Sequence, residues 1–216
     1  MRKNLIILGT SGLAREMAML AEHINAVHHS WNIMGFIGEP GCTVGTNLGI
    51  APILGDDSWV LEQDLVADLV VGIGYPKIKE KVIEPYLKAA HRFTFPNLIH
   101  PKATLDLRRV ELGMGNTVTA GCVFTCDIRV QDFNLFNLNT TIGHDVKIGS
   151  MNVINPGSNI SGGVRIGDRV LIGTGAQILQ KVLIDSDSTI GAGSVVTKNV
   201  GSNQTVFGIP ARRLIE

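Results

Sequence analysis

The chain has 216 residues, of which 44% are hydrophobic and only 5% aromatic, and its 19 basic and 19 acidic side chains leave a formal net charge of zero. This length allows one large or two modest domains, whose interior has to be built mainly from aliphatic side chains. A neutral balance argues against a surface that coats nucleic acid or an anionic membrane, so we expect neither as a partner.

The cysteines and the N-terminus set further limits on the class of protein. Cys42, Cys122 and Cys126 form neither a paired disulfide framework nor a zinc-binding motif, which favours a reducing cytoplasm and no bound metal. The apolar run at residues 5–8 stops at Gly9, too early for a signal peptide or a membrane span. We therefore expect a cytoplasmic protein that does not insert into a membrane.

Alternating strands and helices predict a small α/β (Rossmann-like) domain over residues 1–102. In chain order, the predicted elements are a buried strand at 4–9, a helix from about Leu13, strands at 33–37 and 68–72, and a helix from Pro76 to about Ala90. Met17, Leu20, Ala21 and Ile24 have the spacing of one buried helix face.

The turn Gly9-Thr10-Ser11-Gly12 is the first candidate for ligand binding. It resembles half of a dinucleotide fingerprint but lacks the spacing G-x-G-x-x-G, because Ser11 and Ala14 stand where glycines would be required. The free amides of a helix N-terminus suit a phosphate or diphosphate, and a turn without a ligand is the alternative. A ligand is expected beyond the carboxyl ends of the strands, where this turn, Gly38-Glu39 and Gly74-Tyr75 converge.

The rest of the chain, residues 103–216, is organised around a repeat of six residues. A helix repeats its apolar face every 3.6 residues and a strand every 2, so a sustained period of six predicts a hexapeptide β-helix with one short strand on one wall of a prism per unit. The inward register contains no polar residue and consists of Leu112, Val118, Phe124, Val130, Phe136, Ile142, Ile148, Ile154, Ile160, Ile166, Ile172, Ile178, Ile184, Ile190 and Val196.

Two further regularities accompany the repeat. Asn116, Asn134 and Asn152 are three hexads apart, so they stack as a hydrogen-bonded ladder if three hexads make one coil; otherwise they merely recur. Glycine follows the inward residue in several hexads, where we expect unusual backbone dihedrals that glycine adopts at little cost. These glycines are Gly113, Gly143, Gly149, Gly167, Gly173 and Gly191.

His144 is the strongest candidate for chemistry, because it is the one histidine of six that lies within the hexads. It comes two residues after the inward Ile142, so it should project outward from a corner, and Asp145 follows. An imidazole in this position can act as a general base near neutrality, and the carboxylate can raise its basicity and fix its tautomer. A surface histidine without chemistry is the alternative.

Other polar candidates have plainer interpretations. His28 and His29 fit a solvated loop, and His100, which precedes a proline, fits a structural role. Cys122 falls at a small inward position and should pack inside the prism. Cys126 occupies a corner one coil before His144, and no neighbour that would activate its thiolate is evident.

With these residues, the chain resembles the hexapeptide acyltransferases that modify sugars, and more narrowly the sialic acid O-acetyltransferase and nucleotide-aminosugar N-acetyltransferase (NeuD/PglD-type) group. The resemblance extends over nearly the whole chain. It rests on GTSGLARE at 9–16, GFI at 35–37, GIG at 72–74, NLIHP at 97–101, GHD at 143–145 and GIPAR at 208–212.

The resemblance implies a left-handed β-helix, a homotrimer, and acetyl-CoA as co-substrate in the groove between neighbouring prisms. It also implies that His144 is the general base, that Asp145 raises its basicity, and that Thr174 and Ala192 lie beside the pantetheine arm. By the same resemblance, the sugar or nucleotide sugar contacts Ser11, Gly12, Leu13, Gly38, Glu39 and Gly74.

The chain departs from some members at positions that concern the acceptor. Some relatives have an acidic pair where this chain has Gly38-Glu39, a histidine at Leu13, and a second histidine near the acetyl group at Val153. These departures concern the identity of the sugar and the nucleotide.

The resemblance thus implies an acetyl-CoA-dependent acetyltransferase that modifies an amine or hydroxyl of a sugar or nucleotide sugar in surface glycan biosynthesis. Two alternatives belong to other classes. A non-catalytic, sugar-nucleotide-binding trimer would have no need of the pair His144-Asp145. A zinc-dependent carbonic anhydrase of the β-helix type needs three histidines per metal, and the hexads supply one.

Overall fold

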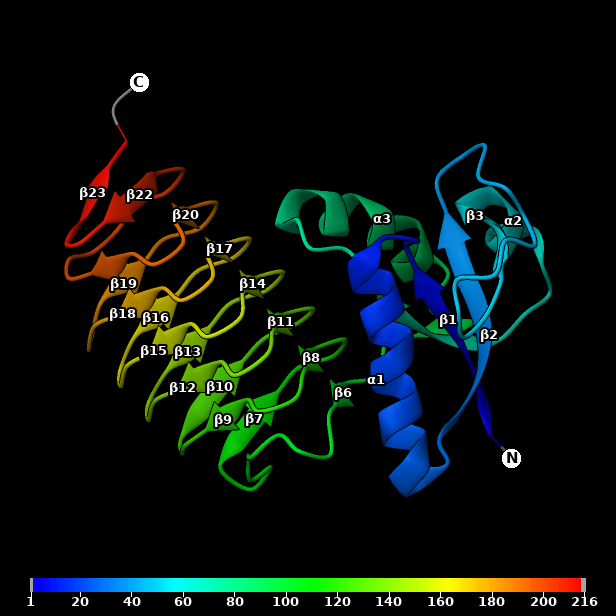
Figure 1. Ribbon diagram of the computed structural model, residues 1–216, viewed down its shortest axis with the longest axis horizontal. Coiled ribbons are helices and arrows are strands. Elements are labelled where there is room, and N and C mark those ends of the chain that lie inside the picture. The colour runs from blue at the N-terminus through cyan, green and yellow to red at the C-terminus, as the bar shows by residue number, and fades with distance from the viewer. Residues whose placement is uncertain (1, 215–216) are drawn as a thin grey trace. The chain divides into compact units, whose positions relative to one another are not determined.

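The computed structural model describes residues 2–214 and divides into two compact units, Met1–Pro101 and Lys102–Glu216. The first is an α/β unit and the second is a left-handed parallel β-helix, which confirms the predicted fold class (Figure 1).

The first unit is built on a parallel five-stranded sheet with the strand order β3-β2-β1-β4-β5 (Figure 1). Three of its strands and two of its helices were predicted from sequence. The short β3, α2 and β5 were not, because elements of two to six residues show no clear periodicity. The elements are β1 (Lys3–Leu8), α1 (Gly12–His28), β2 (Trp31–Gly38), β3 (Ile53–Asp56), α2 (Asp57–Glu62), β4 (Ala67–Val71), α3 (Pro76–Lys88), β5 (Phe93–Thr94) and β6 (Leu98–Ile99).

Helix α1 packs its predicted apolar face against the sheet, where Met17 and Ala21 are fully buried. Gly72 permits this approach. A Cβ added to Gly72 would lie 2.5 Å from the Cα of Ala14, so only glycine lets the end of β4 meet the first turn of α1. The turn after β1 is thereby held at the carboxyl edge of the sheet.

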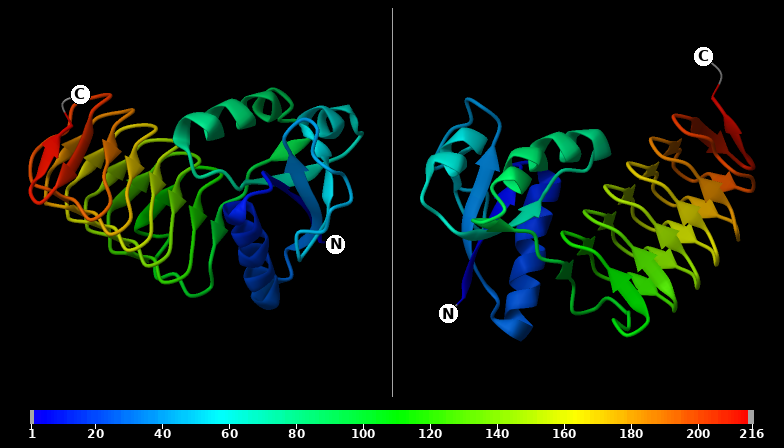
Figure 2. Two further views of the ribbon diagram at one scale, coloured as in Figure 1. Left: turned by 45° about the horizontal axis from the view of Figure 1, so that its top comes forward. Right: turned by 180° about the vertical axis from the view of Figure 1, so that it is seen from behind.

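The second unit is a three-sided prism of stacked coils (Figure 2). Wall 1 contains β7 (Val110–Leu112), β10 (Ile128–Val130), β13 (Lys147–Ile148), β16 (Arg165–Ile166) and β19 (Leu183–Ile184). Wall 2 contains β8 (Thr117–Val118), β11 (Leu135–Phe136), β14 (Val153–Ile154), β17 (Leu171–Ile172), β20 (Thr189–Ile190) and β22 (Thr205–Gly208). Wall 3 contains β9 (Val123–Phe124), β12 (Thr141–Ile142), β15 (Asn159–Ile160), β18 (Gln177–Ile178) and β21 (Val195–Val196).

Up to Val196, each coil consists of three hexads and pairs in parallel with the next coil, as where Thr141 faces Asn159. The last coil is two residues shorter, because Ile190 faces Val206. The inward positions predicted from the period of six are buried, with exposures of at most 4%, except for the half-buried Leu112 in the first coil. The last strand, β23 (Ala211–Arg213), pairs antiparallel with β22 in the predicted C-terminal segment.

The predicted asparagine ladder is present and fully buried. Asn134 donates from Nδ2 to the Oδ1 of Asn116 at 3.0 Å, and Asn152 donates to the Oδ1 of Asn134 at 2.9 Å. Each Oδ1 also accepts a backbone N–H from the next coil, as from Val170 at the top of the ladder at 2.7 Å. The side chains therefore satisfy one another and the backbone at this corner.

The glycines that follow the inward residues were predicted to adopt unusual backbone dihedrals, and this prediction was wrong. None of these six described glycines has a positive φ; the left-handed conformation falls two residues later, as at Asp145 and Gly193. Glycine is needed because the next coil passes close by. A Cβ would lie 2.6 Å from the backbone nitrogen of Gly162 if added to Gly143, and 2.5 Å from that of Ala192 if added to Gly173.

Within residues 2–214, no helix is long and apolar enough to cross a membrane.

We expect Asn134→Ala to destabilise the β-helix, because it leaves the N–H of Asn152 and the carbonyl of Gly149 without their partner in the interior. Each orphaned buried group costs about 1–3 kcal/mol. Urea unfolding should show the loss, whereas the exposed Asn32→Ala should change little. Equal stabilities of the two variants would contradict a structural role for the ladder.

Candidate active site

His144 stands at the corner where the chain passes from β12 on wall 3 to β13 on wall 1. Asp145 takes the left-handed conformation, with φ 61°, that turns the chain at this corner. The corner is tied to the coils on both sides, because Asp145 donates its N–H to Cys126 and His144 accepts that of Gly163. His144 is thus fixed at its base and projects outward, as predicted, with a side chain that is 61% exposed.

The imidazole of His144 is hydrogen-bonded to the neighbouring carboxylate. Nδ1 lies 2.7 Å from Oδ2 of Asp145. Because a carboxylate only accepts, Nδ1 carries the proton and donates it, so that Nε2 is left with a free lone pair. The two residues therefore form a histidine whose tautomer and ring direction are set for accepting a proton at Nε2.

Gly162 is a further candidate for the site that the analysis of the sequence missed. It occupies the same corner one coil after His144, and a Cβ added to it would lie 2.5 Å from Nε2 and 2.7 Å from Cε1 of that ring. Its N–H has no hydrogen-bond partner among residues 2–214. Counting three hexads onward from the corner of His144 was the signal that could have identified it. The absence of a side chain here makes room for the imidazole and leaves a free amide beside it.

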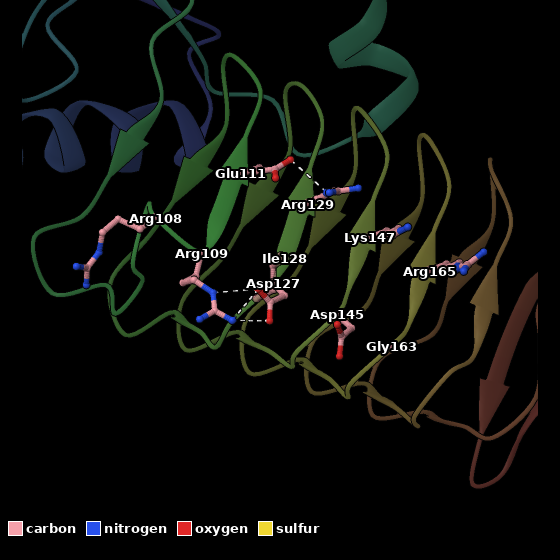
Figure 3. Close-up of a pocket in the computed structure, with 10 residues that line it drawn as sticks. All are labelled: Arg108, Arg109, Glu111, Asp127, Ile128, Arg129, Asp145, Lys147, Gly163 and Arg165. Atoms are coloured by element: carbon pink, nitrogen blue, oxygen red, sulfur yellow. Dashed lines mark hydrogen bonds and ion pairs between the residues drawn. The ribbon is translucent and has the colours of Figure 1, made fainter.

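A cavity of about 450 Å³ adjoins this corner along wall 1 (Figure 3). It includes Asp145, Gly163 and, one coil earlier, Asp127. Arg109 forms an ion pair with Asp127 at 2.7 Å and thereby lowers the pKa of that carboxyl. Charged side chains line most of the cavity, and one of them is Asp145, whose carboxylate is hydrogen-bonded to His144.

Thr174 and Ala192 lie at a different corner of the prism from His144. Both are exposed and stack in successive coils at the corner between wall 2 and wall 3, where Gly193 donates to the carbonyl of Thr174 at 2.8 Å. Wall 3 separates this corner from His144. One chain therefore does not bring the predicted base and the predicted acetyl-CoA contacts together. Val153 is buried on β14 of wall 2.

In the first unit, the predicted acceptor residues meet at the carboxyl edge of the sheet. A Cβ on Gly74 would lie 3.5 Å from Leu13, and one on Gly38 would lie 3.4 Å from Thr10. Ser11 precedes α1 and donates from its hydroxyl to the carbonyl of Gly72 at 3.4 Å, rather than capping the helix. Gly12 and Glu39 are exposed at the same edge. The structure thus gathers this set as the strand order predicts.

The other candidates remain outside this chemistry. Cys122 is fully buried, and burial raises the pKa of its thiol. His100 is buried and shares a hydrogen bond of 3.0 Å with His23. His28 ends α1 instead of lying in a loop, and His29 follows it; both are exposed. The described part of the chain holds no cluster of three or more His, Cys, Asp or Glu side chains that would bind a metal ion.

Comparisons with known proteins cover both units. The family described as "PglD N-terminal domain" matches residues 4–86, and "Bacterial transferase hexapeptide (six repeats)" matches residues 145–180 and 163–198. A search of curated proteins found no match. Among solved structures, the acetyltransferase domain of PglB from Neisseria gonorrhoeae FA1090 is 30% identical, with 99% of this chain and 100% of that chain covered and a TM-score of 0.86. This chain belongs to the PglD-type family of hexapeptide-repeat sugar acetyltransferases.

Solved structures of similar proteins include some that hold ligands. The PglB domain has also been crystallised with acetyl coenzyme A. A perosamine N-acetyltransferase from Caulobacter crescentus is 28% identical over 99% of this chain and 97% of its own, with a TM-score of 0.85; that structure holds CoA and GDP-perosamine and carries a histidine-to-asparagine substitution. WeeI from Acinetobacter baumannii AYE is 26% identical, with coverages of 97% and 99% and a TM-score of 0.85.

We expect Gly162→Ala to turn the His144 ring away from its present position, because the added methyl would occupy the space of Nε2 and Cε1. NMR signals of the imidazole should shift and its hydrogen bond to Asp145 should weaken. Gly201→Ala is the matched control, since a Cβ there meets only the flexible end of Gln204. An unmoved His144 signal in the first variant would show that the glycine does not set the ring position.

Proposed function

We propose that this protein transfers the acetyl group of acetyl-CoA directly to an amine or hydroxyl of a nucleotide sugar, with His144 as the general base. The observation that carries the proposal is the pair of an exposed Nε2, oriented by the hydrogen bond of Nδ1 to Asp145, and the unpartnered amide of Gly162 beside it. Relatives of similar structure that hold CoA, acetyl-CoA and GDP-perosamine support the co-substrate and the acceptor class.

The chemistry needs no covalent enzyme intermediate. Nε2 of His144 takes the proton of the acceptor amine or hydroxyl as that atom attacks the thioester carbonyl. In this proposal the N–H of Gly162, which has no partner among the described residues, donates to the oxyanion that develops. When the tetrahedral species collapses, the carbon–sulfur bond breaks, and the thiolate of CoA takes the proton from the imidazolium of His144. Asp145 keeps Nδ1 protonated throughout.

The position of the site favours a homotrimer in which neighbouring chains complete each other. Wall 3 presents only uncharged outward side chains, which are Val123, Thr141, Asn159, Gln177 and Val195. On wall 2, the outward Thr117, Leu135 and Val153 are already at most 5% exposed within the chain. If wall 3 of each chain faces a three-fold axis, the His144 corner of one chain adjoins the Thr174 corner of the next.

The carboxyl edge of the first unit is the proposed site for the sugar nucleotide. Ser11, Gly12 and Leu13 present the start of α1, which suits a phosphate, while Gly38, Glu39 and Gly74 line the neighbouring strand ends. Where some relatives have two adjacent acidic residues, this chain has Gly38 and Glu39, so that only one carboxylate is present. We also propose a role in surface glycan biosynthesis and a cytoplasmic location, where acetyl-CoA and nucleotide sugars are available.

His144→Ala should lower kcat by about 10²–10⁴-fold, the usual contribution of a general base, and should leave the Kd of acetyl-CoA unchanged. Acetylated products from a panel of amino and hydroxy sugars, GDP-perosamine included, are measured by mass spectrometry. The exposed His91→Ala is the control. An unaltered kcat in His144→Ala would remove the proposed base. Titration heat with nucleotide sugars but none with acetyl-CoA would instead indicate a non-catalytic binding protein.

Val195→Arg on wall 3 should break the trimer, because three guanidinium groups would meet at the axis, whereas Leu183→Arg on wall 1 should not. Light scattering after gel filtration measures the mass.

A mixed-variant test addresses the shared site. His144→Ala and Ala192→Trp, each inactive alone, should regain activity at about a quarter of the sites when refolded together in equal amounts. Failure to regain any activity would place both residues in one chain's site.

A further inference from the structure

The corner of His144 carries carboxylates on two successive coils. Asp127 and Asp145 occupy the same position one coil apart, because Asp145 donates its N–H to the carbonyl of Cys126, and both take the left-handed conformation, with φ 57° and 61°. Figure 3 shows the two side chains along the same edge of the prism. Paired strands lie about 4.8 Å apart, so the two acidic residues follow each other at the distance of one coil. Only Asp145 is hydrogen-bonded to the ring of His144, which leaves the role of Asp127 to be explained.

Arg109 neutralises Asp127. Its guanidinium holds the carboxylate at two points, since Nη2 lies 2.7 Å from Oδ2 and Nε lies 3.0 Å from Oδ1 (Figure 3). The hydrogen bond from Arg109 is the main cause that lowers the pKa of Asp127, and the same bond raises the pKa of Arg109. Both groups therefore carry their full charges near neutrality, and these charges cancel.

The position of this pair matters more than its strength. The two side chains are 55% and 51% exposed, and an exposed ion pair stabilises a fold by about 0–1 kcal/mol. The positive charge of a protonated His144 is one of the causes that lower the pKa of Asp127, so the two groups are within electrostatic range. Such coupling is mutual, and a bare carboxylate at Asp127 would in return favour the protonated imidazole.

Other charged groups also surround the corner. They lie on the coil of His144, on neighbouring strands of wall 1, and two coils later at the same corner. In that order they are Asp145 and Lys147, then Glu111, Arg129 and Arg165, and finally Lys181. The thiol of Cys126 hydrogen-bonds to Asp127 as well. Substitution of Arg109 by a neutral residue changes one charge beside the ring and leaves these others in place.

We propose that Arg109 is a positioning residue for the base, an inference that rests on the proposed function of the His144 corner. By neutralising Asp127, it leaves Asp145 as the carboxylate that acts on the imidazole. The tautomer is then fixed without an additional negative charge that would hold the ring protonated. Only the neutral ring has the lone pair at Nε2 that takes a proton from the acceptor. Arg109 thereby extends toward lower pH the range in which the base can act.

The test uses Arg109→Gln, Asp127→Asn and the combined variant. Asparagine tolerates the left-handed conformation of residue 127, so the backbone of the corner is kept. NMR titration at an ionic strength of about 10 mM measures the pH at which the His144 ring is half protonated. We expect this midpoint to rise by about 0.3–0.5 pH units in Arg109→Gln, to fall by a similar amount in Asp127→Asn, and to return to the wild-type value in the combined variant. The acid limb of the kcat/KM profile should move in the same directions.

Two further variants and added salt are the controls. Arg108→Gln removes the same charge from a guanidinium that pairs with Asp106 at 2.6 Å and points away from Asp145, so it should leave the midpoint in place (Figure 3). Arg109→Lys keeps the charge and should keep the wild-type midpoint. Salt at about 1 M, where the Debye length is about 3 Å, should remove the shifts of both single variants.

The direction of the shifts separates a charge effect from a structural one. A structural role would lower the stability to urea in both single variants and would move both midpoints the same way or not at all, and either result for the midpoints would overturn the proposal. Opposite shifts would support it. Because the titration needs no turnover, opposite shifts in a protein that acetylates no sugar would support the coupling and count against the proposed function alone.

Discussion

Parallel pairing of each coil with the next, in a register of three hexads up to Val196, is the constraint on which the second unit depends. It places every side chain over its counterpart in the neighbouring coils, so that chemistry repeats in columns. One column is the buried asparagine ladder, another is the aliphatic core, and a third is the outward row of Arg129, Lys147 and Arg165 on wall 1. The corner of His144 is part of such a column, with Cys126 one coil before it and Gly162 one coil after it.

Much of this unit could be predicted because the period of six depends only on which residues turn inward. Burial of Ile142 and its counterparts, the outward direction of His144, and the stacking of the asparagines all follow from counting. The reason for the regular spacing of glycines did not follow in the same way. Whether glycine serves a backbone dihedral or a close approach depends on the distance between coils, as at Gly143 and Gly173, and the pattern of letters does not contain that distance.

The candidate site was predicted only in part for a related reason. A general base and its carboxylate are adjacent in the chain, so His144 and Asp145 could be recognised together. Counting three hexads from His144 gives the place of Gly162 in the column, but a glycine shows no chemistry in the sequence, and only the structure places it against the imidazole ring. The grouping of charges in space was also hidden. Arg109 and Asp127, or Glu111 and Arg129, are a full coil apart along the chain and become pairs only when coils stack. In the first unit, β3 was too short to predict, and the edge of the sheet was clear without it.

The coil length also restricts how proteins of this architecture can change in size. Because strand residues up to Val196 stand above those three hexads earlier, an insertion or deletion of one whole coil leaves all later side chains on their original walls and corners. A change of one hexad within a wall moves everything that follows to another wall, and a change that is not a multiple of six also turns core residues outward. Loops that bulge from a single corner escape this rule, since the strands on either side keep their phase. Evolutionary lengthening of the prism should thus proceed in coil-sized steps, with irregular lengths confined to corners.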